Sequence, residues 1–473
     1  MSLAQAVYLQ APSWAQTVLL SVYGWQIGRH RYGAPYRAAV QRLLEQERWP
    51  AERIREYQDA RVRDIVRVAY GETTYYRRLL DAAGISPADI RGVDDLPKLP
   101  LLTKDVVRAR GPELMTRSRP GRGWLHGHTS GTTGSPLSLW YDRALCIMNN
   151  AVDRQEKAWG GMPDDAWIGL LLGRVIVPSA QRRPPFWRSN WMLRQHWFSS
   201  FHMSDETLGG YVAEMRRCGL RFLEGYPSTL YILAKYLRRR GTTLPMRAVF
   251  SSSETVLPLQ RAVIEQVFEC PLFDFYGLAE RVIFAGECEQ HAGKHISAEF
   301  GYVEVVDEEG MPVPPGQPGY LVGTSLHNTA MPMIRYRTGD YSAILTDPCP
   351  CGRTSARLRD VTTKAEDIVV TPDGRMISPS VLTHPFKPLD QIVKSQLIQD
   401  HPDHLLVKIV ASEEFRPDQE RQLVEALQER LGRDMTIEVR VVSDIPSESS
   451  GKFRWVVSRV AHDSRLPWAA EPA

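Results

Sequence analysis

The stretch from residue 246 to residue 277, MRAVFSSSETVLPLQRAVIEQVFECPLFDFYG, places a helical pattern between two short apolar runs. The runs MRAVF and LFDFY resemble buried strands, and the intervening LPLQRAVIEQVF repeats apolar residues at intervals of three and four. A strand, a helix and a second strand in this order are typical of parallel pairing, because a parallel connection needs a crossover of that length. The stretch therefore predicts an α/β sheet.

The same alternation extends from about residue 125 to about residue 345. Apolar runs such as WIGLLL (167–172) and RFLEGY (221–226) alternate with helical patterns such as STLYILAKYLRRRG (228–241). We expect a large domain built on a mostly parallel sheet that helices cover on both faces. The basic and aromatic segment 182–198 is interpreted as a surface insertion packed on this domain, with a substrate-facing loop as the alternative.

The two ends of the chain have other patterns. Residues 36–95 are mostly helical in pattern, and Thr103 is suited to cap a further helix. From about residue 362 on, strand patterns and one amphipathic helical pattern indicate a compact α+β unit. We predict an N-terminal domain of residues 1–361, whose first 95 residues are a mainly helical accessory region, and a C-terminal domain of residues 362–473.

Size and composition limit the class of protein. A chain of 473 residues exceeds what one hydrophobic core usually serves, which favours at least two domains. The formal net charge of +3 gives no argument for nucleic acid as the main partner. Six scattered cysteines suit a reducing compartment, so the cytoplasm is the expected location. The apolar run at 17–25 is too short to span a bilayer and is interpreted as a packed or peripheral helix.

The segment HTSGTTGSP (128–136) combines five hydroxyl residues with two glycines. Glycines let a backbone turn its N–H groups toward an anion, and hydroxyls add donors without bulk, so the segment suits a phosphate. It does not match the P-loop of nucleotide triphosphatases, because no lysine follows the second glycine. A solvated turn is the alternative.

Four other segments carry chemically useful residues. In FDFYGLAE (273–280) an aromatic ring that can stack on a base precedes a carboxylate that can hold Mg²⁺. YRTGD (336–340) ends in an acidic residue of the type that binds ribose hydroxyls, SSSE (251–254) is a polar turn, and PSESSGK (446–452) ends in a lysine. Taken singly, each residue is better explained structurally: Tyr276 as core, Asp340 as a cap and Lys452 as a solvated charge.

In combination these segments resemble the adenylate-forming superfamily of acyl-CoA synthetases, peptide-synthetase adenylation domains and luciferases. The motifs TSGTTGSPL, FYGLAE, MPMIRYRTGD, CPCGR and SSGK stand in the family's order across nearly the whole chain. The sequence is most similar to the phenylacetate–CoA ligase group, including relatives found with capsular polysaccharide genes. Leu137 stands where most of the superfamily has lysine, which is typical of that group.

The resemblance implies a large α/β domain, a small mobile α+β domain and an ATP- and Mg²⁺-dependent reaction. A carboxylic acid is activated to an acyl-adenylate with release of pyrophosphate, and coenzyme A then takes the acyl group. Transfer to an amine is the alternative acceptor reaction. A catalytically inactive nucleotide-binding protein is a third reading, which the presence of Thr132, Glu280, Asp340 and Lys452 disfavours. Homodimers occur in the group.

The resemblance also assigns roles to individual residues. Those expected to hold the β- and γ-phosphates are Thr129, Ser130, Gly131, Thr132, Thr133 and Gly134. Those expected around adenine are Ser252, Ser253, Glu254, Tyr276 and Gly277, with Tyr276 stacking on the base. Glu280 is expected to bind Mg²⁺, and Asp340 to bind the ribose.

Lys452 is expected to bridge the substrate carboxylate and the α-phosphate, where it neutralises charge in the transition state. Since Lys452 belongs to the small domain, adenylation requires the two domains to close, and the family's hinge matches TTKAEDIVV (362–370). The match places Glu366 or Asp367 in the expected hinge region. Thr363 and Lys364 replace the family's usual Gly-Arg, which puts a ribose or hinge role of Lys364 in doubt because lysine lacks the guanidinium fork.

Two further predictions concern metal and substrate. Structural zinc takes four Cys or His ligands, and ECEQHAGKHI (287–296) with CPCGR (349–353) offers such a set. The candidates are Cys288, His295, Cys349 and Cys351, with His291 as a rival to His295 and a loop of free thiols as the alternative. The acid is expected near Tyr226 and Pro227, where an aromatic lining suits an aryl or arylalkyl acid.

Overall fold

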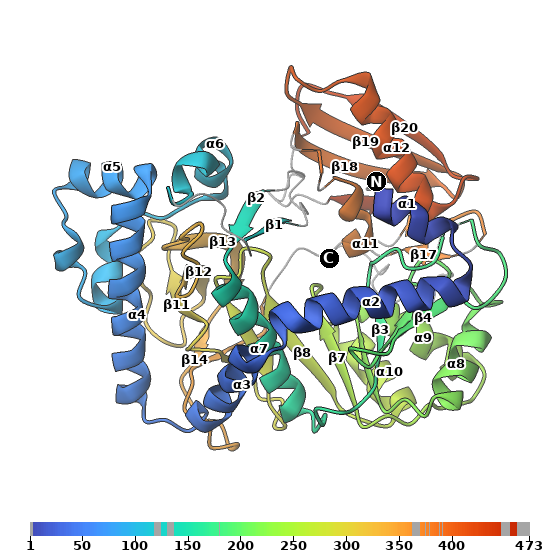
Figure 1. Cartoon of the computed structure of the whole chain (residues 1–473), viewed down its shortest axis with the longest axis horizontal. Coiled ribbons are helices and arrows are strands. Elements are labelled where there is room, and N and C mark those ends of the chain that lie inside the picture. Colours follow the sequence, from blue (N-terminus) through green and yellow to red (C-terminus); the bar gives the residue numbers. More distant parts are fainter. Residues whose placement is uncertain are drawn as a thin grey trace.

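The protein is described by a computed structural model. Of the 473 residues it describes 3–117, 124–129, 137–178, 180–361, 369–373, 375–377, 379–386, 388–389, 391–445 and 455–460. Figure 1 shows a broad α/β body with a smaller sheet-and-helix unit, formed by the end of the chain, above one side of it. The α/β class and the division into a large N-terminal and a small C-terminal part agree with the sequence prediction.

A ten-stranded mixed sheet is the centre of the large body. In spatial order its strands are β14 (Ile344–Leu345), β15 (Arg357–Leu358), β10 (Lys294–Ile296), β9 (Phe284–Glu287), β8 (Leu272–Gly277), β7 (Ala248–Ser252), β6 (Phe222–Gly225), β3 (Ile168–Leu171), β5 (Gln195–Phe198) and β4 (Trp187–Asn190). The strands from β8 to β5 run parallel, as predicted, whereas β4 on one side and β9, β10, β15 and β14 on the other pair antiparallel.

The decisive stretch folds as a β–α–β unit, and its local signals explain why. The helix α10 (Pro258–Phe268) begins with Pro258 in its first turn, where the missing N–H has no role. It buries Val263, Ile264, Val267 and Phe268, which form one stripe toward the sheet. On either side of it, β7 and β8 pair in parallel with Val249 opposite Leu272.

Helices make up much of the rest of the large body, and the first of them begins at Leu3. They are α1 (Leu3–Gln10), α2 (Ser13–Arg31), α3 (Ala34–Gln46), α4 (Ala51–Glu72), α5 (Thr74–Ala83), η1 (Pro87–Asp89), η2 (Val93–Lys98), α6 (Lys104–Leu114), α7 (Arg143–Trp159), α8 (Leu208–Arg217) and α9 (Pro227–Arg239). The helical pattern at 36–95 is thus confirmed, and Thr103 caps α6 by accepting a hydrogen bond from the Val106 amide. Throughout the described chain, every helix is too short or too polar to cross a membrane.

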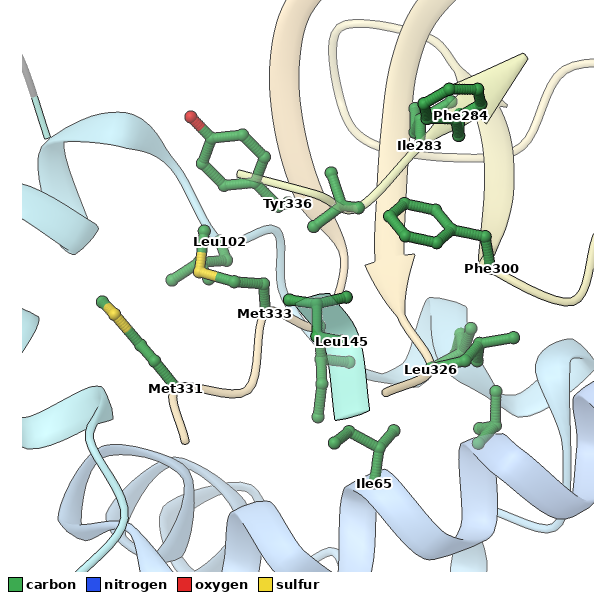
Figure 2. Packing of buried hydrophobic residues seen from close by; sticks show 14 of the residues in the cluster. Ile65, Leu102, Leu145, Ile283, Phe284, Phe300, Leu326, Met331, Met333 and Tyr336 are labelled. Carbon is green, nitrogen blue, oxygen red and sulfur yellow. The ribbon is translucent and has the colours of Figure 1, made fainter. Parts of the chain in front are cut away.

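Two hydrophobic cores lie against the large sheet. One contains strand residues such as Leu171 and Val249 together with α8, α9 and α10. The other gathers α3 to α7, the β8–β9 region and a three-stranded antiparallel sheet of β11 (Gly301–Val306), β12 (Gly319–Ser325) and β13 (Tyr336–Ser342). Figure 2 shows part of this second core, in which Ile65 of α4, Leu145 of α7 and Met333, shortly before β13, come from separate segments.

The segment 182–198 differs from its prediction as a surface insertion. Its second half forms the antiparallel pair β4 and β5, and β5 adds to the parallel centre of the main sheet beside β3. The basic Arg188 is buried there, and its Nε donates to Gln16 Oε1 of α2 at 2.6 Å. The segment is therefore an edge of the sheet that α2 covers, which its aromatic and basic composition did not indicate.

The described C-terminal residues form a separate four-stranded sheet of order β20–β19–β18–β21. The elements are β16 (Val369–Val370), β17 (Met376–Ile377), α11 (Pro379–Leu382), η3 (His384–Phe386), β18 (Ile392–His401), β19 (His404–Ala411), α12 (Pro417–Leu431), β20 (Thr436–Val441) and β21 (Val456–Ser458). Buried Leu423, Leu427 and Trp455 belong to its core, and Phe201 and Tyr226 of the large body join the same cluster. The domain boundary at residue 361 remains a prediction.

Candidate active site

Three parallel strands bring the predicted site residues to one edge of the sheet. β6, β7 and β8 end at Gly225, Ser252 and Gly277, and their carboxyl ends lie together because the strands are parallel neighbours. Open α/β sheets bind ligands at this edge, outside the carboxyl ends of the strands. The turns that follow contain Tyr226 with Pro227, Ser253 with Glu254, and the segment up to Glu280.

The hydroxyl-rich segment is framed by a two-stranded hairpin of β1 (Leu125–His128) and β2 (Ser138–Tyr141). At its neck Thr129 N donates to Leu137 O at 3.1 Å, and Thr129 Oγ1 accepts from Leu137 N at 2.8 Å. These two hydrogen bonds hold Thr129 and Leu137, near the two ends of the segment, opposite each other. The other predicted phosphate ligands, Ser130, Gly131, Thr132, Thr133 and Gly134, lie outside the described residues.

The exit strand of this hairpin is joined to the turn that carries Glu280. The Tyr141 hydroxyl of β2 donates to the Ala279 carbonyl at 2.6 Å, and the Arg281 guanidinium lies 4.2 Å from the centre of the Tyr141 ring. Arg281 adopts a positive φ of 55°, so the backbone bends sharply directly after Glu280. The carboxylate predicted to bind a metal ion therefore lies in a turn that is bonded to the β1–β2 hairpin.

Glu280 is buried, and Tyr336 orients it. The Tyr336 hydroxyl donates to Glu280 Oε1 at 2.5 Å. Burial, and then the neighbouring carboxylate, raises the pKa of Tyr336 well above its usual value, so the hydroxyl keeps its proton. Sequence reasoning missed Tyr141, Arg281 and Tyr336 as parts of the site, although Tyr336 begins YRTGD and Arg281 follows GLAE directly.

The residues predicted for adenine and ribose lie together. The Tyr276 hydroxyl donates to Asp340 Oδ2 at 2.7 Å, and the Asp340 amide donates to Thr338 Oγ1 at 3.0 Å. Burial, followed by the Asp340 carboxylate, raises the pKa of Tyr276 well above its usual value. Asp340 lies within β13 rather than at its end, after Gly339 with a φ of 89°. Two motifs separated by some sixty residues thus share one hydrogen bond.

The polar turn after β7 contacts the neighbouring helix. Glu254 Oε2 accepts from the Ser228 amide in the first turn of α9 at 3.1 Å, an arrangement that satisfies a helix-end donor. Ser253 has a φ of 71°, and its hydroxyl oxygen lies 3.4 Å from that of Ser252. Ser252, Ser253 and Glu254 therefore border the sheet edge, and Glu254 has a structural contact besides its predicted role.

Tyr226 and Pro227 lie where the large body meets the C-terminal part of the chain. Pro227 occupies the first turn of α9, and the Tyr226 carbonyl accepts from the Leu230 amide at 3.0 Å. The Tyr226 side chain is buried in the cluster that includes Val381 and Phe386. Burial is also the main reason that the pKa of Tyr226 is raised to about 12.

A second group of predicted ligands converges at the opposite side of the sheet. One ligand atom each of Cys288, His295, Cys349 and Cys351 lies within 4.8 Å of all the others. His291, the rival candidate, instead has its Nδ1 at 2.9 Å from Glu287 Oε2. The remaining predicted residues, Lys364 and Lys452, and the hinge candidates Glu366 and Asp367 lie outside the described residues.

The sequence is similar to those of several known proteins. Residues 369–459 match the family described as the CapK C-terminal domain. Protein CapK of Staphylococcus aureus is 24% identical over 464 residues, covering 96% of this chain and 99% of that protein. The phenylacetate-coenzyme A ligase of Thermus thermophilus is 30% identical over 353 residues, covering 69% of this chain and 74% of that enzyme.

Solved structures share the fold. The crystal structure of 2-hydroxyisobutyryl-CoA ligase in the postadenylation state, in complex with R3-HIB-AMP, aligns with a TM-score of 0.56 and 20% identity over 87% of this chain and 91% of that chain. The same ligase in the thioesterification state, with 2-HIB-AMP and CoA, aligns with a TM-score of 0.56 and 21% identity over the same shares.

Proposed function

The chain belongs to the phenylacetate–CoA ligase-like group of the adenylate-forming superfamily, and on that premise we propose that it is an AMP-forming acid–CoA ligase. In the first step a carboxylate oxygen bonds to the α-phosphorus of ATP while the bond to the bridging β-phosphate oxygen breaks, and pyrophosphate leaves. In the second step the sulfur of coenzyme A bonds to the acyl carbon, and AMP leaves with the carboxylate oxygen. The thiol proton passes to solvent.

The observation that carries this proposal is the joining of separate motifs at the carboxyl edge of the sheet. Tyr276 contacts Asp340, Tyr336 contacts Glu280, and Tyr141 contacts the residue before Glu280. Phosphoryl transfer depends chiefly on positioning and charge neutralisation, so a site for it needs oriented polar groups rather than a protein nucleophile. These contacts supply that orientation in a buried setting.

Asp340 and Tyr276 suit the nucleoside part of ATP. The Tyr276 hydroxyl holds one carboxylate oxygen of Asp340, which orients the carboxylate as an acceptor for ribose hydroxyls. The face of the Tyr276 ring is proposed to stack on adenine, with Gly277 and the turn Ser252–Glu254 at its border. The phosphate tail would then extend toward the β1–β2 hairpin and residues 129–134.

Glu280 suits a magnesium ion, because Mg²⁺ in nucleotide sites is bound by one or two carboxylates together with phosphate oxygens. Among the described residues, the donor that the structure gives Glu280 is the Tyr336 hydroxyl on Oε1, so Oε2 is the candidate ligand atom. When bound, the ion neutralises charge on the phosphates. Glu280 itself contributes a fixed negative charge that Tyr336 orients.

Lys452 is proposed to meet the substrate carboxylate and the α-phosphate once the C-terminal domain closes over the sheet edge. Withdrawal of that domain about the hinge at 362–370 would then open access for the thiol. This alternation rests on family membership, because Lys452 and the hinge lie outside the described residues. A homodimer is a prediction on the same basis, and a cytoplasmic location is a prediction from the six scattered cysteines.

The acid is proposed to be a small carboxylic acid, with an aryl or arylalkyl group favoured. The phenylacetate-coenzyme A ligases among the relatives support this class by their names. In this chain Tyr226 and Pro227 lie beside the carboxyl edge, and Tyr226 presents a buried aromatic side chain there. The acid would enter between these residues and the hydroxyl-rich segment.

Exchange of labelled pyrophosphate into ATP tests the first step, since it requires a reversible adenylation. We expect exchange that depends on one class within a panel of aryl, arylalkyl and short aliphatic acids. Glu280→Gln should reduce the exchange rate by about 100-fold, as expected when a charge-stabilising group is lost. The matched control Glu308→Gln removes an exposed carboxylate that accepts from Tyr320, and it should leave exchange unchanged. ATP binding without exchange for any acid would contradict the proposal and favour an inactive nucleotide-binding protein.

A second candidate keeps adenylation but transfers the acyl group to an amine. This candidate is kept because the similarity to CapK, which covers 96% of this chain and includes the C-terminal match at 369–459, is to a relative whose name specifies no coenzyme A acceptor. Acceptor dependence separates the two candidates. AMP release stimulated by coenzyme A supports the thiol ligase, whereas stimulation by an amino sugar or amino acid without coenzyme A supports the amide-forming reaction.

A further inference from the structure

Four sulfur- and nitrogen-bearing side chains meet at the antiparallel edge of the main sheet, away from the carboxyl edge of the parallel strands. Cys288 directly follows β9, His295 lies within β10, and Cys349 and Cys351 belong to the loop between β14 and β15. The three segments are adjacent because β9, β10 and β15 are neighbouring strands. From these positions we propose that the four side chains bind one structural zinc ion.

The spacing of the ligand atoms fits a shared ion. Cys288 Sγ lies 3.7 Å from Cys349 Sγ, and Cys351 Sγ lies 3.3 Å from His295 Nε2. Zinc bonds of about 2.3 Å to sulfur and about 2.0 Å to nitrogen place two tetrahedral sulfurs about 3.8 Å apart, and a sulfur and a nitrogen about 3.5 Å apart. A disulfide needs sulfurs about 2.05 Å apart, so the Cys288–Cys349 separation matches a common ligand rather than a bond.

The outer contacts of His295 set its orientation for metal binding. Its Nδ1 lies 3.1 Å from Ser355 Oγ and 3.3 Å from the Ser355 carbonyl oxygen. A carbonyl can only accept, so Nδ1 carries the proton and Nε2 presents its lone pair toward Cys351. Histidines that bind zinc in proteins typically donate their other ring nitrogen in this way.

Two backbone amides are aimed at the sulfurs. The Gln290 amide donates to Cys288 Sγ at 3.5 Å, and the Arg353 amide donates to Cys351 Sγ at 3.4 Å. In both cases the donor lies two residues after the cysteine, so each cysteine begins a tight turn that returns an N–H to its own sulfur. Such donors stabilise the negative charge of a thiolate, which is the form that binds a metal.

The donor set favours zinc over other metals, and a structural role over a catalytic one. Three sulfurs and one imidazole in a tetrahedral arrangement are typical of Zn²⁺, whereas Mg²⁺ and Ca²⁺ take oxygen ligands. Four protein ligands also leave no position for substrate or water. Cys288 and His295 are fully buried and Cys349 is nearly so, which closes the site further.

The proposed ion would tie the sheet edge to the N-terminal helices through Arg353. The Arg353 side chain forms ion pairs with Glu47 at 3.2 Å and with Glu289 at 2.8 Å, and it lies 4.6 Å from the centre of the Trp159 ring. Trp159 in turn donates its ring N–H to Glu47 at 2.7 Å. A zinc ion bound by Cys351 thereby helps to hold the C-terminal ends of α3 and α7 against β10 and β15. Since β15 ends at Leu358, the zinc site also fixes the chain shortly before the predicted hinge.

Elemental analysis of the full-length protein tests the proposal directly. The protein is purified without chelator, passed through gel filtration in metal-free buffer, and measured for zinc and iron per chain. We expect about one zinc per chain, released when the thiols are modified with a mercurial reagent. Less than stoichiometric zinc, stoichiometric iron, or a Cys288–Cys349 disulfide in freshly purified protein would overturn the assignment.

Variants and a substitute metal sharpen the test. Cys349→Ser and Cys351→Ser should each lower the zinc content at least tenfold after dialysis, on the scale expected for loss of metal-site contacts. Cys270→Ser and His291→Ala are matched controls outside the cluster and should keep the zinc. Should the ligand variants fail to fold, Co²⁺ added to zinc-depleted wild type should give thiolate-to-cobalt absorption, and its absence would contradict the site. None of these readouts depends on ligase activity.

Discussion

Tyr336→Phe isolates one hydrogen bond at the centre of the candidate site. The Tyr336 ring is fully buried among apolar neighbours, several of which appear in Figure 2, and phenylalanine can keep that packing. The substitution removes only the hydroxyl that donates to Glu280 Oε1 at 2.5 Å. The change therefore leaves a buried carboxylate without the donor that orients it.

The expected loss follows from the type of bond. A hydrogen bond to a charged group contributes about 1.5–3 kcal/mol to stability, which corresponds to roughly a 10- to 150-fold change in the ratio of folded to unfolded protein. Glu280 is 5% exposed, so water can replace the lost donor only in part. We expect the free energy of unfolding to decrease by an amount in this range. The apparent Mg²⁺ affinity in pyrophosphate exchange should decrease about tenfold.

Tyr320→Phe provides a control of the same chemistry. The Tyr320 hydroxyl donates to Glu308 Oε1 at 3.2 Å on an exposed surface, so its removal should change the free energy of unfolding by less than about 0.5 kcal/mol. Urea denaturation of both variants and of wild type measures the difference. If Tyr336→Phe is no more destabilising than Tyr320→Phe, and its Mg²⁺ dependence equals that of wild type, the role assigned to Tyr336 is wrong.

Three further predictions address the ribose, the lysine and a buried acid. Asp340→Asn should lower kcat/KM for ATP by about 10- to 150-fold, because one charged hydrogen-bond acceptor is lost. Lys452→Ala should reduce acid-dependent pyrophosphate exchange by about 100- to 1,000-fold while ATP binding persists. Burial raises the pKa of Glu299 to about 7, so the folded protein favours the protonated acid. The stability that this preference provides is fully present below the ordinary pKa of glutamate and is lost as pH rises through about 7. Glu299→Gln should therefore exceed wild type in stability by roughly 3 kcal/mol at pH 8 and match it near pH 4.5.

Each of these outcomes has a direct check. Exchange assays over a range of ATP concentrations distinguish a raised KM in Asp340→Asn from a general loss of active protein, and an unchanged kcat/KM would remove Asp340 from the nucleotide site. Exchange by Lys452→Ala at the wild-type rate would show that another group neutralises the reacting charges. Thermal unfolding of Glu299→Gln from pH 4.5 to pH 8 should give a gain that grows with pH, and a gain independent of pH would exclude ionisation of Glu299 as the cause.

The parallel centre of the main sheet could be predicted because its signals are local. The run of apolar, helical and apolar patterns at 246–277 is read within a window of neighbouring residues, and it forms β7, α10 and β8. The cap at Thr103 and the helix at 417–431 follow from the same kind of short-range pattern. The edge strand β4 and its neighbour β5 were missed, since their four-residue runs differ little from an aromatic loop until a neighbouring strand pairs with them.

The candidate site could also be predicted only in part. Its residue types were evident as motifs, because a carboxylate, an aromatic ring or a glycine-rich loop has the same chemistry wherever the chain places it. The hydrogen-bond partners were not evident: Tyr276 meets Asp340 across 64 positions, and Glu280 meets Tyr336 across 56. The meeting of Cys288 with Cys349 across 61 positions, in contrast, was predicted, because both are residue types that bind zinc. The amino-acid sequence by itself determined the α/β class, the order of the elements and the chemical groups available. Only the tertiary structure decided which groups share a hydrogen bond, since such contacts depend on strand order and register, and these arise from packing across the whole sheet.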